Sequence, residues 1–268
     1  MTSLEGYGPW AVIAGGSEGV GASFASQLAD AGLNLVLLAR KPGPLEETAA
    51  AARAKGVEVR TLSVDLTAPG ALDRIRTVTA ELEVGLLIYN AGSNTYGHEF
   101  VTGDPLGVQG VIDLNITAQL ELVRHFGAAM RDRRRGGILL VGSMQGYMGA
   151  AQIGVYAAAK AFGRVFAEGL WLELREYDVD VLELVLGATR TPAMARAGLN
   201  FDIPGLVVSE PDDVAREGLA HLANGPVFVA GGHARAAEKR SAPDRGRVLL
   251  AAHEAAKKML PPPARTAR

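Results

Sequence analysis

The sequence contains no cysteine and no excess of one charge. Without thiols, the 268 residues exclude disulfides, cysteine nucleophiles and cysteine-ligated metal sites, and they fit a reducing compartment, so we expect a cytoplasmic protein. The 27 Lys and Arg nearly balance the 29 Asp and Glu, which gives no support for nucleic acid or an anionic membrane as a partner. The chain shows neither the pattern of a signal peptide nor an apolar stretch that predicts a transmembrane segment.

Aromatic residues make up only 6% of the chain, whereas glycine occurs 33 times. This composition favours tight backbone turns over an aromatic-rich core. Hydrophobic residues still reach 48%, which is enough for a substantial buried core. The five histidines show no ligand spacing, so we expect no metal site.

Short apolar runs alternate along the chain with longer stretches of helical periodicity. The predicted strands are 11–14, 34–39, 58–62, 85–89, 138–142, 180–186 and 227–229. The predicted helices are 19–31, 45–55, 70–81, 105–131, 156–176 and 211–223. Because this alternation implies right-handed crossovers, we expect a single α/β domain over residues 1–230. It would contain a doubly wound parallel sheet of about seven strands flanked by helices on both faces.

Two segments depart from the alternation. Residues 188–210 contain two prolines and two glycines, which predicts an irregular loop that acts as a substrate lid. Residues 231–268 hold nine Lys and Arg against three Asp and Glu. This composition predicts a basic, solvated C-terminal helix over 248–260 and a frayed tail that includes three consecutive prolines.

A glycine-rich turn follows the first predicted strand and opens the first predicted helix. Gly15 and Gly19 let the backbone approach a pyrophosphate, and Gly21 allows close helix packing. The helix N-terminus adds amide donors and a favourable dipole. Because the turn has this place between a strand and a helix, it predicts a dinucleotide site rather than a turn that only needs glycine.

The end of the second predicted strand bears on the choice of dinucleotide. An acidic residue there would accept the ribose 2′-hydroxyl of NAD and repel a 2′-phosphate. The chain has Arg40 and Lys41 instead, and Arg40 can pair with a phosphate through two donors. We therefore expect NADP, with NADPH preferred over NADH. The alternative is a solvated basic pair without a ligand.

Over about residues 8 to 230 the sequence resembles the short-chain dehydrogenase/reductases of the compact, single-domain type, which implies a Rossmann-like fold. The matching motifs, in chain order, are the turn over 14–21, Asp65-Leu66, Asn90-Ala91-Gly92, Asn115, Ser143, Tyr156-x-x-x-Lys160 and the segment 187–191. Three positions depart from the family pattern. Ala14 replaces the usual Thr, Leu186 replaces the usual Pro, and Glu18 stands where several NADP-preferring members carry Arg or Lys.

The resemblance implies a set of cofactor-binding residues around the turn and the strand ends. They are Gly15, Ser17, Glu18, Gly19, Val20, Gly21, Arg40, Asp65, Leu66, Asn90, Ala91, Gly92, Tyr156, Lys160, Gly187, Thr189 and Thr191. Some of these have plainer readings. Asp65 can simply end its strand, Asn90 can bond backbone across strands, and Thr191 can cap a helix instead of binding the nicotinamide carboxamide.

The predicted catalytic residues are Asn115, Ser143, Tyr156 and Lys160. Tyr156 and Lys160 are four residues apart and therefore share a helix face. A nearby ammonium lowers the pKa of a tyrosine, which would make Tyr156 a proton donor for a carbonyl or an acceptor from an alcohol. Ser143 would hold the substrate oxygen. By resemblance, Asn115 would fix a water that links Lys160 to solvent.

By the same resemblance the substrate site lies at the carboxyl ends of the strands. It would be lined by Ser93, Tyr96, Met144, Gln145, Tyr147, Met148, Ile153 and Met194. This mostly apolar set favours a bulky, hydrophobic carbonyl or secondary alcohol. We expect an NADP(H)-dependent oxidoreductase that forms a homodimer or homotetramer through the helices over 105–131 and 156–176. The alternative is a catalytically inactive NAD(P)-binding regulatory or scaffold protein.

Overall fold

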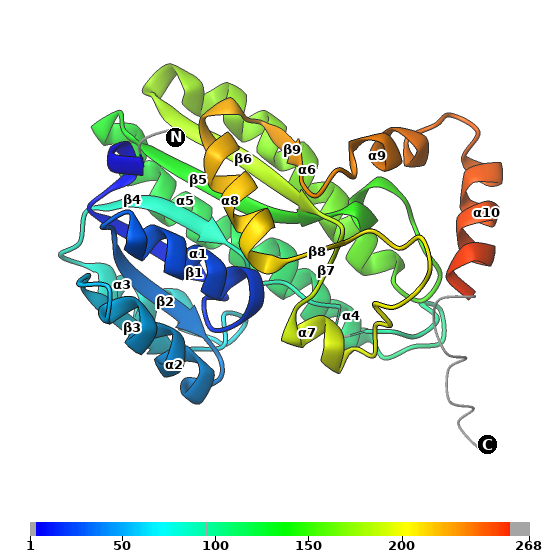
Figure 1. Cartoon of the computed structure of the whole chain (residues 1–268), viewed down its shortest axis with the longest axis horizontal. Coiled ribbons are helices and arrows are strands. Elements are labelled where there is room, and N and C mark those ends of the chain that lie inside the picture. Colours follow the sequence, from blue (N-terminus) through cyan, green and yellow to red (C-terminus); the bar gives the residue numbers. More distant parts are fainter. Residues whose placement is uncertain (1–3, 95, 258–268) are drawn as a thin grey trace.

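Seven parallel strands form the central sheet of the computed structural model, which describes residues 4–94 and 96–257. Their order is β3-β2-β1-β4-β5-β6-β9 (Figure 1). They span β1 (Trp10–Ala14), β2 (Asn34–Ala39), β3 (Val59–Ser63), β4 (Val84–Tyr89), β5 (Gly136–Ser143), β6 (Val179–Leu186) and β9 (Val227–Val229). The order reverses between β1 and β4, so the prediction of a doubly wound α/β sheet is confirmed.

Helices cover both faces of the sheet (Figure 1). One face is packed by α1 (Gly19–Asp30), α2 (Pro42–Arg53) and α8 (Pro211–His221). The other is packed by α3 (Ala71–Thr79), α5 (Ala118–Arg133) and α6 (Gly154–Leu174). The remaining helical pieces are η1 (Leu4–Tyr7), α4 (Pro105–Ile112), η2 (Asp113–Thr117), η3 (Met144–Tyr147), η4 (Arg175–Tyr177), α7 (Pro192–Arg196), η5 (Leu222–Asn224), α9 (Ala234–Arg240) and α10 (Arg245–Lys257).

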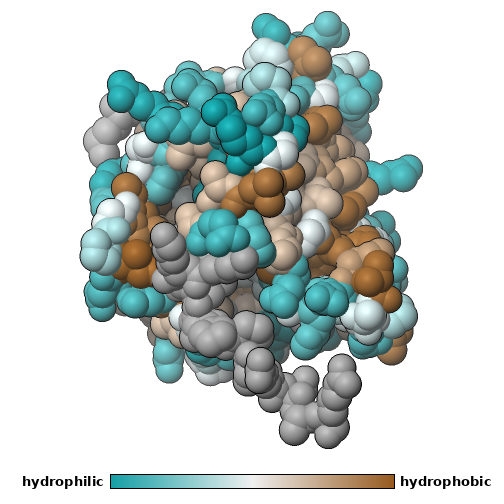
Figure 2. Space-filling view, turned by 90° about the vertical axis from the view of Figure 1, so that its right-hand side faces the viewer, coloured by the Kyte–Doolittle hydropathy of each residue, from teal (hydrophilic) through white to brown (hydrophobic). Residues whose placement is uncertain are grey.

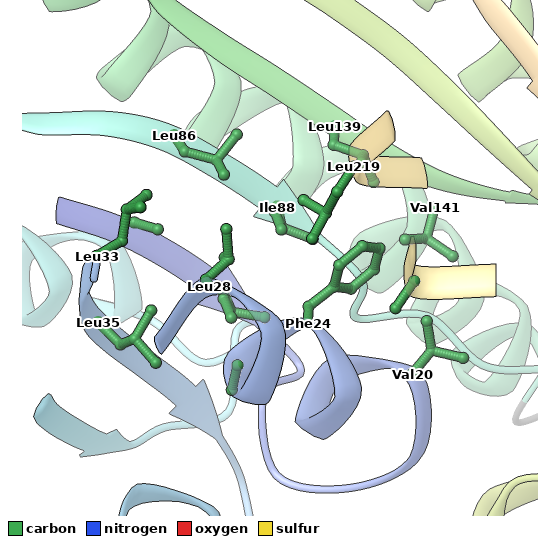
Figure 3. Close-up of a cluster of buried hydrophobic side chains, with 14 of the residues drawn as sticks. Val20, Phe24, Leu28, Leu33, Leu35, Leu86, Ile88, Leu139, Val141 and Leu219 are labelled. Carbon is green, nitrogen blue, oxygen red and sulfur yellow. The ribbon is translucent and has the colours of Figure 1, made fainter. Parts of the chain in front are cut away.

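Both faces of the inner strands are buried, which explains their uninterrupted apolar runs. Every residue of β1 and β4 is buried. Side chains of α1, such as Phe24 and Leu28, point onto the sheet beside Ile88 and Leu139 (Figure 3). All four are fully buried. This packing fixes the start of α1, and with it the glycine-rich turn, against the end of β1.

The predicted single helix over 105–131 is wrong, because a π-helical turn, η2, separates α4 from α5. Asn115 lies in this turn, and its side-chain Nδ2 donates to the carbonyl oxygen of Val111 at 2.9 Å. One turn further on, the Ala118 N–H donates to the Asp113 oxygen, five residues back. The Asn115 side chain thus occupies a carbonyl of the preceding helical turn, and the backbone widens around it.

The two segments outside the alternation are more ordered than predicted. Residues 188–210 contain β7 (Ala188–Thr189), α7 and β8 (Val208–Ser209), and β7 pairs with β8 in a separate parallel sheet. The C-terminal segment forms two helices, α9 and α10, rather than one over 248–260. The end of that predicted helix and the three prolines lie outside the described residues. Within the described ranges, no helix combines the length and apolarity needed to cross a bilayer.

Candidate active site

Glycines shape the turn between β1 and α1 because no side chain would fit there. Gly15 has a positive φ of 82°, and an added Cβ would lie 2.9 Å from the Ala91 nitrogen. A Cβ on Gly21 would collide with the Gly15 carbonyl oxygen. Gly19 also has a positive φ, and its Cβ would lie 3.0 Å from Thr191. The exposed backbone of this turn and the uncapped start of α1 fit a pyrophosphate.

The turn is tied to the end of β4. The Asn90 backbone N–H donates to the Ala14 oxygen at 2.9 Å, and its side-chain Nδ2 donates to the Gly15 oxygen at 2.8 Å. The plainer reading of Asn90, as a bond between strand ends, is therefore what the structure contains. Asn90 and Ala91 lie directly beside the glycine turn, whereas Gly92 lies against Asn115 and Lys160. The backbone oxygen of Ser17 joins the turn to α2 by accepting from Thr48 Oγ1 at 3.0 Å.

The predicted reader of the adenosine ribose lies at the exposed end of β2. Arg40 is exposed, and its charge helps to lower the pKa of the nearby Asp65 carboxyl. Most of that lowering comes from the backbone N–H and hydroxyl of Thr67, which both donate to Asp65 Oδ1. Asp65 therefore also holds the turn that follows its strand. The half-buried Leu66 lies next to it.

The Glu18 carboxylate in the glycine turn pairs with a cation from a distant helix. Both of its carboxylate oxygens pair with the Arg196 guanidinium of α7, one of them at 3.0 Å. This pairing is the main reason for the lowered pKa of Glu18, and Lys41 adds a smaller effect. This contact could not be predicted from the sequence, because the partners are 178 residues apart.

The predicted acid–base residues meet at the end of β5. The Ser143 hydroxyl lies close enough to the Tyr156 hydroxyl to lower its pKa. Lys160 is buried, and its Nζ donates to the Val141 oxygen at 3.0 Å and lies 5.7 Å from the centre of the Tyr156 ring. The backbone N–H of Gln145 also donates to Ser143 Oγ, at 3.2 Å, which fixes the hydroxyl at the start of η3.

Asn115 reaches the same place from η2. Its Nδ2 donates to Ser93 O at 3.0 Å as well as to Val111 O. A Cβ on Gly92 would lie 2.8 Å from Asn115 Oδ1 and 2.9 Å from Lys160 Nζ. The glycine therefore opens the space in which the amide and the ammonium approach each other, so all four predicted catalytic residues are brought together.

The expected lowering of the Tyr156 pKa is wrong for this structure. Burial raises the pKa of the Tyr156 hydroxyl above its usual value, and the nearby Ser143 hydroxyl opposes that effect only in part. Burial also lowers the pKa of Lys160 to about 8, although the Glu183 carboxyl opposes it. The cause is the same for both groups, because a buried site disfavours each charged form.

The residues after β6 continue from the carboxyl edge of the sheet into α7. Thr189 is buried and its hydroxyl donates to the Gly187 oxygen at 3.2 Å. Thr191 caps α7, because its Oγ1 accepts from the Met194 N–H at 3.2 Å. The helix cap is therefore present in the structure, and the binding of the nicotinamide carboxamide by Thr191 stays a prediction. Val20, the second residue of α1, is buried.

The predicted substrate-lining residues differ in how far they are buried. Met144 and Met148 are buried, and Tyr147 packs with Met144 and stacks on Arg164 at 5.0 Å. Tyr96 is buried too, but its hydroxyl donates to the Glu99 oxygen at 2.8 Å. Gln145, Ile153 and Ser93 are half-buried and Met194 is exposed. Tyr96 thus shapes its own loop rather than offering its hydroxyl to the crevice.

The C-terminal arm, α9 and α10, contacts the site in a way that composition did not indicate. Arg240 donates to the Met144 oxygen at 2.7 Å, and Arg245 donates to the Tyr147 oxygen at 3.3 Å. Ala237 is buried against Met144. The sequence predicts no helix over α9. Arg240 of α9 and Arg245, the first residue of α10, both hold the backbone that follows Ser143, so the expectation of a fully solvated basic segment is wrong.

His233 is a further group that sequence reasoning set aside. Its ring lies against Gly187, where any Cβ would collide with it. Burial, with a smaller contribution from Arg240, lowers the pKa of His233. The His233 ring thus packs against the backbone that follows β6.

We expect Gly21→Ala to destabilise the fold by ~1–3 kcal/mol, because the new methyl group meets the Gly15 backbone and Asn90. Gly43→Ala is the matched control. It also lies in a first helical turn but has nothing within 4 Å of an added Cβ. Urea unfolding at pH 7 measures both variants. Equal stability of the two would contradict the tight packing described here.

Known proteins are similar to this chain in sequence and in architecture. A family model described as short chain dehydrogenase matches residues 9–200. A 7beta-hydroxysteroid dehydrogenase of Clostridium sardiniense is 29% identical over 232 residues, which cover 86% of this chain and 88% of that protein.

Two solved structures extend the likeness to nearly the whole chain. A short-chain dehydrogenase from Sphingobium yanoikuyae in complex with NADPH is 31% identical, with a TM-score of 0.77 and coverage of 97% of this chain and 98% of that one. A bulky-bulky ketone specific alcohol dehydrogenase from Comamonas testosteroni is 26% identical, with a TM-score of 0.73 and the same coverage. With the family model matching most of the chain, this protein belongs to the short-chain dehydrogenase/reductase family and is an oxidoreductase.

Proposed function

We propose that this enzyme uses NADP(H) to interconvert a carbonyl group and a secondary alcohol in a bulky, hydrophobic compound. The observation that carries this proposal is the convergence of Ser143, Tyr156 and Lys160 at the end of β5. They lie at the carboxyl edge of the sheet, where open α/β sheets bind their ligands.

The chain's own residues would hold the cofactor along this edge. The Gly15–Gly21 backbone and the start of α1 would take the pyrophosphate, and the exposed Arg40 would pair with the 2′-phosphate. The NADPH bound in the relative from Sphingobium yanoikuyae supports the choice of NADP. When bound, the nicotinamide supplies the hydride.

Tyr156 is the proposed proton donor to the carbonyl oxygen, and Ser143 holds that oxygen beside it. The raised pKa of Tyr156 means that its hydroxyl carries the proton at neutral pH, which suits reduction. Loss of that proton leaves a phenolate, which the nearby Lys160 ammonium stabilises. We propose that Asn115, next to Lys160, helps to resupply the proton from solvent.

The substrate class follows from the apolar character of the site. Met144 and Met148 are adaptable apolar side chains behind Ser143, and Met194 is exposed on α7. The side of the molecule that carries the α9–α10 arm has apolar surface between hydrophilic margins (Figure 2). The names of the relatives that act on a hydroxysteroid and on bulky ketones support a substrate of this kind.

Tyr156→Phe should lower carbonyl reduction by about 10²–10⁴-fold, because the proton donor is lost while the ring remains. The assay follows NADPH oxidation with a 7-oxo bile acid and with benzil as probes. Tyr177→Phe is the control, since Tyr177 lies just before β6 and contacts Arg131 instead of the site. Wild-type turnover by Tyr156→Phe would refute the mechanism. Turnover only of small sugars or acids would refute the substrate class.

Arg40→Asp should weaken NADPH binding by about tenfold to a hundredfold, because a charge-assisted pair with the 2′-phosphate is lost. NADH binding should stay equal or improve. Fluorescence titration with both nucleotides measures the ratio. Arg175→Asp is the matched control, because Arg175 stacks on Trp171 before β6, at the opposite edge of the sheet. An unchanged NADPH/NADH ratio in Arg40→Asp would remove the proposed role of this residue.

We also propose a homodimer or homotetramer built on α5 and α6. A groove of about 460 Å³ runs between these helices and is lined by apolar residues such as Val123, Phe166 and Leu170. Val165 and Leu172 on α6 are 58% and 61% exposed in the single chain. A second copy would cover such a surface.

A cytoplasmic location stays a prediction that cell fractionation tests.

Val165→Glu should therefore lower the oligomer mass measured by size-exclusion chromatography with light scattering, because a buried charge opposes association. Leu250→Glu is the control, since Leu250 is 68% exposed on α10, away from the groove. A wild-type chain that stays monomeric, or a Val165→Glu variant with wild-type mass, would contradict this interface.

A further inference from the structure

Glu183 is a buried carboxyl in the middle of β6 that the proposed mechanism does not use. It is only 2% exposed, and its neighbours along the strand, Leu182 and Leu184, are core residues. Its position faces α6 rather than the α8 side of the sheet. An acid at such a place has a high desolvation cost unless a nearby group compensates for it.

Two glycines leave the space that the carboxyl occupies. A Cβ on Gly142 of β5 would collide with Glu183 Oε1, and a Cβ on Gly163 of α6 would lie 3.3 Å from the same oxygen. Gly163 follows Lys160 by one helical turn, and Lys160 bonds the backbone of Val141, next to Gly142. The carboxyl therefore lies between the sheet and the segment of α6 that carries Lys160.

The charged groups around Glu183 come from two elements. Lys160, Arg164 and Glu168 of α6 all change the pKa of Glu183 electrostatically. The charge of Glu183 in turn helps to raise the pKa of Tyr147 in η3. From α5, the uncharged Gln119 reaches the same space beside Gly163. Among these groups Lys160 has the largest electrostatic effect on Glu183.

The two buried groups act on each other in opposite directions. Burial raises the pKa of Glu183 to about 8, and Lys160 opposes this rise. Burial lowers the pKa of Lys160 to about 8, and Glu183 opposes this fall. Each group thus favours the charged form of the other, as expected of an acid and a base in one poorly solvated space.

We propose that Glu183 is a positioning residue of the catalytic set: its carboxyl lies between the sheet and α6, and once ionised it stabilises the Lys160 ammonium as the pH rises. This inference rests on the proposed roles of Tyr156 and Lys160. Lys160 can stabilise a Tyr156 phenolate only while it carries its proton. Glu183 touches neither substrate nor cofactor in this proposal and acts through Lys160 alone.

The first test is the pH dependence of kcat/KM for NADPH-dependent reduction of the probe ketone. In Glu183→Gln, the loss of the carboxylate lowers the pKa of Lys160, so the rate declines from a lower pH than in the wild type. We expect a shift of about one pH unit. Glu168→Gln is the matched control, because Glu168 is more exposed and pairs with Arg164. Its profile should coincide with that of the wild type.

A Glu183→Gln profile that superimposes on the wild type, or that shifts upward, would overturn the proposal. Glu183→Ala provides a second neutral variant if the amide disturbs folding, and the same downward shift is expected. If Tyr156→Phe retains full activity, the proposed function fails first. The next measurement decides the Glu183–Lys160 pairing without any catalysis.

That measurement is a double-mutant cycle of thermal stability at pH 8 with Glu183→Gln, Lys160→Met and the double variant. Without Lys160 the buried carboxyl has lost its main partner, so Glu183→Gln should raise the melting temperature more in Lys160→Met than in the wild type. Equal shifts in both backgrounds would mean that the two groups do not interact and would overturn the proposal.

Discussion

The hydrogen bonds that join Asn90 to the glycine turn are the constraint on which the site depends. One holds the Ala14 oxygen and the other the Gly15 oxygen, so β4 and the turn after β1 are fixed to each other at two points. These are the two strands between which the sheet order reverses. The crevice at this reversal, where the ligand of an open α/β sheet binds, therefore has one wall whose backbone is set by the fold itself.

On the other side of the site, the Lys160 ammonium has to be buried. Lys160 lies among strand ends and is compensated by one carbonyl oxygen, Val141 O, and by the field of Glu183. Isolated burial of an ammonium would drive it to its neutral form. Val141 of β5, Glu183 of β6 and Asn115 of the π-helical turn must therefore all come close to Lys160. This need explains why glycines occur at 92, 142 and 163, where a methyl group would displace Asn115, Lys160 or Glu183.

Most of the fold could be predicted from the sequence, because each strand and helix carries its own local period. The strands 34–39 and 227–229 match the structure to the residue, and the motif residues Ser143, Tyr156 and Lys160 do come together. The π-helical turn could not be predicted from periodicity. It depends on what the Asn115 side chain bonds, and its second acceptor, Ser93 O, belongs to another segment.

Contacts between distant segments were also beyond the sequence. Glu183 interrupts the apolar run 181–186 of β6, and that interruption was the available signal of a buried partner. Nothing comparable marked Arg240, which holds the Met144 carbonyl from 96 residues away. A composition count makes this arginine part of a solvated basic tail. Its role becomes visible only when the arm is placed against η3.

The pairing of Glu18 with Arg196 shows how such a distant contact changes the reading of a motif residue. Glu18 alone would place a negative charge in the cofactor turn, close to where a phosphate is expected to bind. In the structure its carboxylate is neutralised by α7, so this objection to NADP is weakened and the nearby cation Arg40 remains. The pair is partly exposed and contributes little to stability. The position of α7 must then depend mainly on the Thr191 cap and on the contact of Thr191 with Gly19, which places the start of α7 directly against the glycine turn.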